Sequence, residues 1–255
     1  MPSDSRRREL AALKADHTPH AVAARLAAEP RQNYLRDFVY GAIDGCVTTF
    51  AIVAGVVGAE LPARIVVILG LANVLADGFS MGVSNYLGTK ADRQLVDRAR
   101  KIEERHVADI PAGEQAEIRE IFRQKGFEGD LLDRVVETIT ADRKLWIDTM
   151  LREEWGLSLS RVSAWKAGTA TFAAFVIVGM VPLVPFIAFH AHHFSKPAVF
   201  AISCAATGGT FFGIGALKSR FVGESWFRAG TETLLMGGGA AALAYVVGAL
   251  LRGFA

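Results

Sequence analysis

The stretch of residues 37–88 constrains the fold of this chain more than any other part of the sequence. It reads DFVYGAIDGCVTTFAIVAGVVGAELPARIVVILGLANVLADGFSMGVSNYLG. Each half has the roughly 20 apolar residues that a helix needs to cross a bilayer, yet Asp44 lies in the first half and Asp77 in the second. An unpaired carboxylate in lipid costs at least about 2.5–3.5 kcal/mol, so such a residue usually faces a partner, a cavity or an ion path. The stretch therefore predicts two membrane-spanning helices that serve transport.

Charge is unevenly distributed along the chain. Of the 255 residues, 51% are hydrophobic and 21% charged, and the charged residues crowd into residues 1–37 and 90–161. The formal net charge is only +2 and no basic patch is interleaved with aromatic residues, which argues against a nucleic-acid partner. Cys46 and Cys204 lie in apolar segments without CxxC spacing, so we expect them to pack rather than to form a disulfide or a zinc site.

Hydropathy predicts an all-α membrane protein with five transmembrane helices. The expected spans are residues 38–59, 65–87, 167–189, 198–217 and 226–251. A polar helical segment is inserted between the second and third spans. The expected parts are a basic tail (1–36), spans one and two (37–89), the inserted domain (90–164) and spans three to five (165–255).

Lysine and arginine are dense in the tail, in the insert and in the link between the last two spans. The positive-inside rule therefore places the tail and the insert in the cytoplasm and the C-terminus outside. We expect no signal peptide, because the first 30 residues lack an apolar core. The loop with His190, His192 and His193 falls on the outer side, where we expect it to be solvated.

The inserted domain is expected to be helical, with its first helix continuing the second span out of the membrane. Pro111 ends that helix, and Gly126 and Gly156 follow later ones as helix-ending glycines. The expected helices are residues 88–108, 114–125, 130–141 and 144–155, with a further short helix over 20–28 in the tail. Their apolar stripes are thin, so the domain should need a second copy, the membrane domain or a bound metal to be rigid.

Two sets of polar residues mark the expected membrane path. Asp44 is flanked by glycines at GxxxG spacing, which lets another helix approach closely; a purely structural carboxylate is the alternative. Asn73, Asp77 and Met81 share one helix face and offer an amide, a carboxylate and a thioether, a mixture that suits a first-row transition metal. Met81 could equally fill the core, and Glu232 could be a helper carboxylate or a residue favoured by the helix dipole.

Acidic residues in the insert form the second candidate site. Glu103 and His106 are spaced i, i+3, as are Glu114 and Glu117, so each pair can point at one ion. A third acidic edge holds Met150, Glu153 and Glu154. Solvated helix faces, ion-paired to nearby lysines and arginines, would explain the same spacing, and ExxH occurs only once, at Glu103–His106.

Four segments resemble the vacuolar iron transporter family over nearly the whole chain after residue 31. They read DFVYGAIDGCVTTFAIVAG, GLANVLADGFSMGVSNYLGTKAD, DTMLREEWGL and ETLLMGGGAAALAYVVG. The resemblance implies a five-span homodimer with a cytoplasmic metal-binding domain between spans two and three. It also implies a transporter rather than an enzyme, which moves Fe(II), and often Mn(II), out of the cytosol in exchange for protons.

Site residues follow from the resemblance by motif. Asp44 matches the acid of the first span in the ion path, Met81 the methionine of the second span, and Asp37 an acid near the cytoplasmic mouth. The residues that match metal-binding glutamates are Glu103, Glu114, Glu117 and Glu154, with Met150 beside them. Three positions depart from the family pattern: Asn73 and His106 each replace a glutamate, and Leu151 replaces a second methionine.

These observations together predict a proton-coupled exporter of Fe(II) that serves iron homeostasis. The mixed ligand set leaves Mn(II), Co(II) and Zn(II) open as further substrates. The basic, alanine-rich tail indicates a bacterial member of the family, hence a multi-pass protein of the cell (inner) membrane. Two alternatives remain: a membrane-tethered iron-binding or ferroxidase module, and a metal channel gated by the insert.

Overall fold

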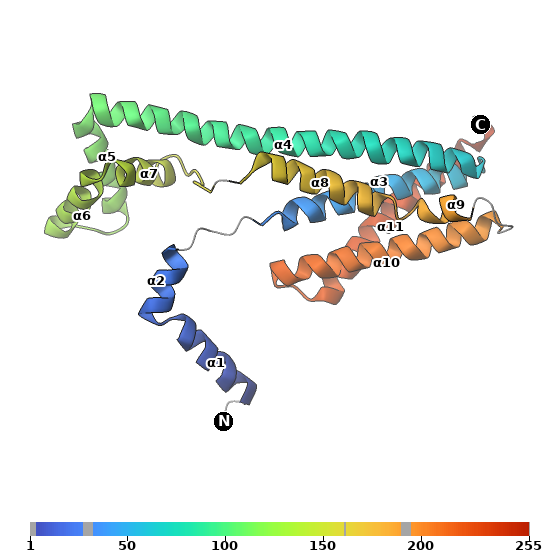
Figure 1. Ribbon diagram of the computed structural model, residues 1–255, viewed down its shortest axis with the longest axis horizontal. Coiled ribbons are helices and arrows are strands. Elements are labelled where there is room, and N and C mark those ends of the chain that lie inside the picture. The colour runs from blue at the N-terminus through green and yellow to red at the C-terminus, as the bar shows by residue number, and fades with distance from the viewer. Residues whose placement is uncertain (1–3, 28–32, 161, 190–194, 255) are drawn as a thin grey trace. The chain divides into compact units, whose positions relative to one another are not determined.

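The computed structural model describes residues 4–27, 33–160, 162–189 and 195–254, and every regular element in these residues is helical (Figure 1). The elements are α1 (Asp4–Asp16), α2 (Pro19–Ala27), α3 (Leu35–Gly58), α4 (Ala63–Asp109), α5 (Pro111–Gln124), α6 (Gly129–Ala141), α7 (Arg143–Glu153), α8 (Ala164–Gly179), α9 (Val184–Ala188), α10 (Lys196–Val222), α11 (Trp226–Leu250) and a final 3₁₀ turn (Arg252–Phe254). Four helices, α3, α4, α10 and α11, are long and apolar enough to cross a membrane. The chain is thus an all-helical membrane protein.

The described helices fall into two units. The first unit, Met1–Asn33, contains α1 and α2, and the second, Tyr34–Ala255, contains all the others. Helix α2 occupies the place of the short tail helix expected from sequence. The expected histidine-containing loop at residues 190–193 lies outside the described residues.

Helix α3 is the hub of the membrane helices, because it packs against α4, α8, α10 and α11. Glycines allow the closest of these approaches. A Cβ added to Gly41 would collide with the backbone oxygen of Thr171 on α8, and one added to Gly45 would lie 2.5 Å from that of Phe175. The GxxxG spacing around Asp44 therefore serves a helix–helix contact, as its sequence indicated.

Substituting Gly45 by alanine is expected to destabilise the bundle by about 1–3 kcal/mol, because α8 must move away from α3. Gly55→Ala is the matched control on the same helix, since its Cβ would meet its nearest neighbour at 3.5 Å, an ordinary contact. Thermal unfolding of the purified proteins in detergent measures the melting temperatures of the two variants. Equal melting temperatures for the two variants would contradict the close α3–α8 contact.

The third expected span is interrupted. Residues 167–189 were expected to form one helix, whereas α8 ends at Gly179 and α9 begins at Val184. Pro182 explains the break, because proline lacks an N–H and its ring clashes with the carbonyl four residues earlier. The hydroxyl of Ser203 on α10 donates a hydrogen bond of 2.7 Å to the Pro182 carbonyl and so satisfies a backbone group at the break.

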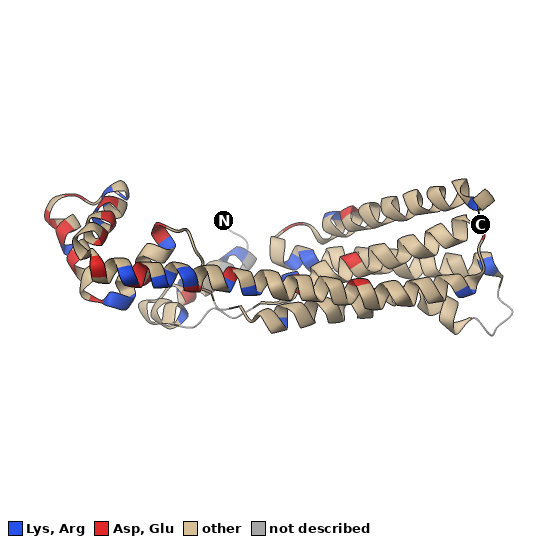
Figure 2. Ribbon diagram, turned by 90° about the horizontal axis from the view of Figure 1, so that it is seen from above, with Lys and Arg blue, Asp and Glu red and all other residues tan. Residues whose placement is uncertain are grey.

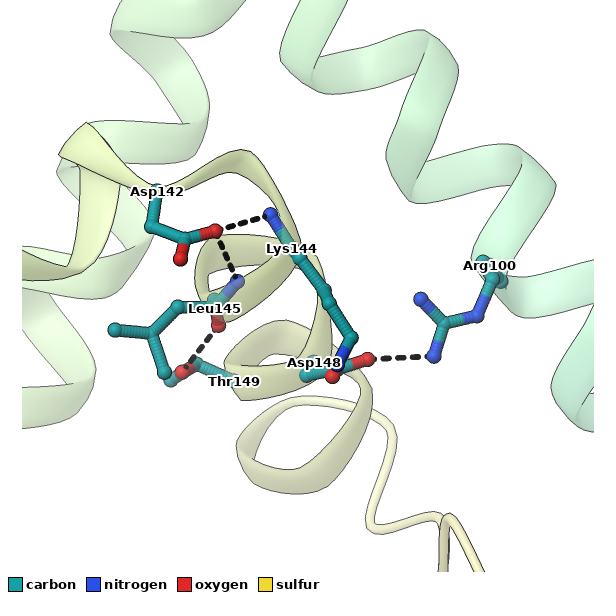
Figure 3. Close-up of polar contacts among 6 residues, drawn as sticks. All are labelled: Arg100, Asp142, Lys144, Leu145, Asp148 and Thr149. Carbon is teal, nitrogen blue, oxygen red and sulfur yellow. Dashed lines mark hydrogen bonds and ion pairs between the residues drawn. The ribbon is translucent and has the colours of Figure 1, made fainter. Parts of the chain in front are cut away.

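Helix α4 leaves the membrane helices without interruption and ends in a small helical domain with α5, α6 and α7 (Figure 1). The apolar core of this domain consists of Ile118, Leu132, Val136, Ile139, Trp146 and Met150. The carboxylate of Asp142 caps α7 by accepting from the backbone N–H groups of Lys144 and Leu145, and Arg100 on α4 pairs with Asp148 on α7 at 2.5 Å (Figure 3). The cap stabilises the first turn of α7, and the ion pair holds α7 against α4.

Candidate functional site

The end of α4 and the start of α5 bring together three side chains of the types that ligate metal ions. Glu103 and His106 come from α4 and Glu114 from α5, and one ligand atom from each lies within 4.8 Å of the other two. Pro111 at the first position of α5 makes the sharp reversal between the two helices, since its fixed φ suits a helix start and it has no N–H to lose. We call Glu103, His106 and Glu114 the metal centre.

Two carboxylates of the metal centre are buried yet incompletely bonded. Glu103 and Glu114 are each 1% exposed, and within the described residues their Oε2 atoms have no hydrogen-bond partner. The Nδ1 atom of His106 lies 3.2 Å from Oε1 of Glu114. When Nδ1 carries the proton and donates it to this oxygen, Nε2 is free to bind a metal. Buried oxygens without donors, beside a free imidazole nitrogen, suit a divalent transition metal.

Negative charge accumulates around the metal centre. Burial raises the pKa of Glu114 to about 8, and the charges of Glu103 and Glu117 add to the effect. Burial also raises the pKa of Glu154, with further contributions from Glu103 and Glu117. Glu117 and Glu154 are thus close enough to feel the buried carboxylates, although both are exposed. Four like charges repel one another until a proton or a cation is bound.

Metal binding at this centre is expected to strengthen as the pH rises towards 8. Glu114, with a pKa of about 8, holds a proton at neutral pH that a cation must displace, which gives up to about tenfold in affinity per pH unit. Calorimetric titration with Zn(II) at pH 6, 7 and 8, in two buffers, measures both the affinity and the protons released. A Zn(II) affinity that stays constant from pH 6 to pH 8 would contradict the raised pKa of Glu114.

The stability of the metal-free protein should change with pH in the opposite direction. Folding raises the pKa of Glu114 from 4.5 to about 8, so its contribution to stability is complete below pH 4.5 and is lost as the pH rises through 8. Unfolding curves measured at several pH values with a chelator present should give a free energy of unfolding that falls as the pH rises.

Two further residues expected in the site make other contacts in the small domain. Glu153 forms an ion pair of 2.5 Å with Lys125 at the end of α5. Met150 is completely buried and belongs to the apolar core of the small domain, with Ile118 and Trp146 as neighbours in that core. Glu154, the residue that follows α7, interacts electrostatically with Glu103, Glu117 and His106.

Trp155, which the sequence did not single out, contacts the metal centre directly. Its indole Nε1 donates a hydrogen bond of 2.9 Å to Oε1 of Glu103. Donors of this kind hold a ligating carboxylate in place and leave its second oxygen for the metal. Trp155 lies far from Glu103 in the sequence, and no spacing rule connects the two.

Replacing Trp155 by phenylalanine is expected to weaken metal binding by about 10- to 100-fold, the usual effect of removing a hydrogen bond to a ligand. An aromatic ring remains while the donor is lost, and Trp155 is 42% exposed, so folding should be little affected. Calorimetric titration measures the loss, and Trp165→Phe, at an exposed tryptophan outside the domain, is the control. Unchanged affinity would show that the hydrogen bond does not position Glu103.

A second group of polar residues follows the contact between α3 and α4. The antiparallel helices bring residues of α3 opposite residues of α4 in successive layers. The middle layer holds Asp44 and Asp77, which are near enough for their charges to interact. We call this group the polar track, and its members are Asp37, Asp44, Thr48, Asn73, Asp77 and Asn85.

Asparagine side chains on α4 form hydrogen bonds in the two end layers of the polar track. The Nδ2 atom of Asn85 donates to Oδ1 of Asp37 at 2.9 Å and to the hydroxyl of Thr171 on α8 at 2.7 Å. The Nδ2 atom of Asn73 lies 3.3 Å from the hydroxyl of Thr48. Asn85 was missed in the sequence, although it continues the i+4 column of α4 residues one turn beyond Met81.

Exposure differs sharply between the two central carboxylates. Asp44 is half-buried on α3, whereas Asp77 is exposed on α4 among apolar neighbours such as Leu75 and Phe79, which are 59% and 66% exposed. Met81 is half-buried one turn from Asp77. Figure 2 shows how sparse charged residues are along these membrane helices and how dense they become in the small domain. Asp77 therefore needs a partner other than lipid.

Glu232 stands apart from the polar track. It is exposed on α11, and the structure pairs it with Lys218 on α10 at 4.0 Å. An ion pair at the surface is worth little in free energy, so this contact does not reveal a role in transport.

A sequence model of the VIT family matches residues 35–249. The chain belongs to the VIT family. The match includes both the metal centre and the polar track, and it confirms the resemblance seen in the sequence.

Curated relatives of this VIT-family chain are named vacuolar iron transporters. The protein of Toxoplasma gondii (strain ATCC 50861 / VEG) is 32% identical over 226 residues, which are 86% of this chain and 75% of that protein. Vacuolar iron transporter 1 of Tulipa gesneriana is 32% identical over 214 residues, 84% of this chain and 85% of the relative. Vacuolar iron transporter 1 of Arabidopsis thaliana is 32% identical over 218 residues, 86% of each chain.

Proposed function

We propose that this chain exports Fe(II) from the cytosol in exchange for protons. The names of the relatives support iron as the substrate. The observation that carries the proposal is the continuity of α4, because this one helix holds Glu103 and His106 of the metal centre and Asp77 of the polar track. A site that collects cations is thereby attached rigidly to acidic residues within a membrane span.

The residues of the two sites divide the task between them. In this proposal the small domain collects Fe(II) from the cytosol on the metal centre, with Glu117 and Glu154 adding charge. The ion then passes Asp37 and reaches Asp44, Asp77 and Met81 in the membrane. Exchange with protons follows from the chemistry of these carboxylates, because a cation and a proton compete for the same oxygens.

The expected organisation of the chain fits this function. We place five spans across the membrane, with the interrupted α8–α9 segment as the third, and the small domain (90–164) as a cytoplasmic insert between spans two and three. Helix α8 alone, with 16 residues, would span about 24 Å at about 1.5 Å per residue, less than the roughly 30 Å of hydrocarbon. The turn and α9 supply the remaining length.

A homodimer explains the exposure of Asp77. On an isolated chain this carboxylate would face lipid at a cost of about 2.5–3.5 kcal/mol. A second copy packed on the exposed face of α4 would remove Asp77 from lipid and place two polar tracks beside the two-fold axis. The exposed apolar residues Leu75 and Phe79 on the same helix would be buried with it.

Transport into proteoliposomes tests the proposal. The purified protein is reconstituted with a trapped pH dye, and Fe(II) is added under anaerobic conditions to the side that holds the small domain. We expect Fe(II) entry with matching proton exit, and competition by Mn(II), Co(II) and Zn(II) ranks the substrates. Entry without proton movement would indicate a channel, and metal binding without entry would indicate a tethered binding module.

A further inference from the structure

An open apolar groove lies between α3, α10 and α11, apart from the metal centre and the polar track. Its volume is about 450 Å³, about three times that of an apolar cavity of ~150 Å³ that binds benzene. Aromatic rings form one wall: Phe50 stacks on Phe200 and Phe200 on Tyr245, with ring centroids 6.4 Å apart in both pairs. The groove can accommodate a long, flexible, apolar ligand.

Glycine residues keep the groove open. Gly208 on α10 and Gly238 on α11 both line it. A Cβ at Gly238 would meet no atom within 4 Å, so glycine is not needed there for helix contact. The space exists because side chains are missing from these positions, and a larger residue could fill it without displacing the helices.

The surroundings identify the occupant. All three helices around the groove are long and apolar enough to span the membrane, so lipid hydrocarbon surrounds them. The exposed carboxylate that calls for a second copy lies on α4, which packs on α3 and α8 rather than on α10 or α11. A second copy on α4 therefore would not cover the groove, which stays in contact with lipid.

A cation lies beyond the aromatic end of the groove. Lys196 begins α10 one helical turn before Phe200, on the same side of the helix. It is exposed, and within the described residues it forms no ion pair. A lysine at the end of a membrane helix is well placed to meet the phosphate of a phospholipid headgroup.

We propose that the groove holds an acyl chain of a membrane phospholipid whose phosphate lies at Lys196. The chain would bury its apolar surface against the rings of Phe50, Phe200 and Tyr245. This inference does not rest on the transported ion, and a lipid bound here would stabilise the folded protein through mass action.

Photolabelling tests the proposal with the full-length protein in phosphatidylglycerol vesicles. A fraction of the lipid carries a diazirine in its acyl chain, and mass spectrometry locates the labelled residues after illumination. Gly238→Leu should reduce labelling of Phe200 and Cys204 by at least about tenfold, because leucine occupies the groove. Gly239→Leu is the matched control, since that neighbouring glycine does not line the groove and its Cβ would also meet no atom within 4 Å.

The possible results separate the occupants. Labelling of Ile177, which is 64% exposed on α8, should be the same in both variants, which shows that Gly238→Leu is folded. Equal labelling of Phe200 and Cys204 in the two variants would overturn the proposal, and so would disulfide-linked dimers of Gly238→Cys, which would place a second copy in the groove. Lys196→Gln should reduce the labelling about threefold, and undiminished labelling would overturn the assignment of Lys196 to the phosphate.

Discussion

Replacing Asp44 by asparagine is expected to reduce Fe(II) transport in proteoliposomes by about 100- to 1,000-fold while leaving the fold intact. The attraction between a cation and one carboxylate at about 4 Å is roughly 4 kcal/mol at an effective dielectric constant of about 20, and about 1.4 kcal/mol corresponds to a tenfold change. Asparagine keeps the size of the side chain but loses both this charge and the ability to exchange it for a proton. Asp44 lies opposite the only other acid of the middle layer, Asp77, so no further carboxylate of the polar track can replace it there.

The control for Asp44→Asn should also remove one acidic charge from a helix that spans the membrane over part of its length. Asp92→Asn serves this purpose, because Asp92 is exposed on the polar half of α4. Its transport should equal that of the unmodified protein. Transport by Asp44→Asn at the level of Asp92→Asn would exclude the proposed membrane site, provided that both variants elute as the same species in size-exclusion chromatography.

Replacing Glu103 by glutamine is expected to weaken metal binding to the small domain by at least about 100-fold, more than the loss of a supporting hydrogen bond would. Glutamine preserves the volume of this buried side chain and can still accept the hydrogen bond from Trp155. It lacks the charge that binds the cation, however. Calorimetric titration of the full-length protein measures the affinity, and transport at saturating Fe(II) should be less affected than transport at low Fe(II).

Glu153→Gln is the matched control for Glu103→Gln. Glu153 is also a glutamate of the small domain, but it pairs with Lys125 rather than with the metal centre. Its loss should leave the affinity within about twofold, since a surface ion pair contributes little. Similar losses in the two variants would mean that the domain binds cations through its total charge and has no defined centre.

The membrane helices could be predicted because hydropathy reports directly which segments lipid can surround. Helix α4 could also be predicted as a single helix, since no proline interrupts it before Pro111. The break at Pro182 could not be found by hydropathy, because an apolar window does not register the missing backbone N–H of proline. Local chain chemistry, rather than burial, decides where that helix stops.

Only part of the metal centre could be predicted from the sequence. Spacing placed Glu103 and His106 on one helix face, but the reversal at Pro111 that brings Glu114 to them is a tertiary feature. Successive residues on a helix point about 100° apart, so only one of the adjacent acids Glu153 and Glu154 can face the centre. The choice depends on Lys125, which directly follows α5 and pairs with Glu153.

The continuity of α4 also has a consequence for how this chain can vary in length. Each residue added to a helix rotates everything beyond it by about 100° and advances it by about 1.5 Å. A single-residue insertion between Met81 and Glu103 would thus turn the helix face that carries Glu103 away from the face that carries Met81. An insertion of seven residues, close to two whole turns, would restore the original direction of the two faces. Evolutionary changes of length in this segment should come in multiples of the helical repeat, while the loops of the small domain are free to grow by any number.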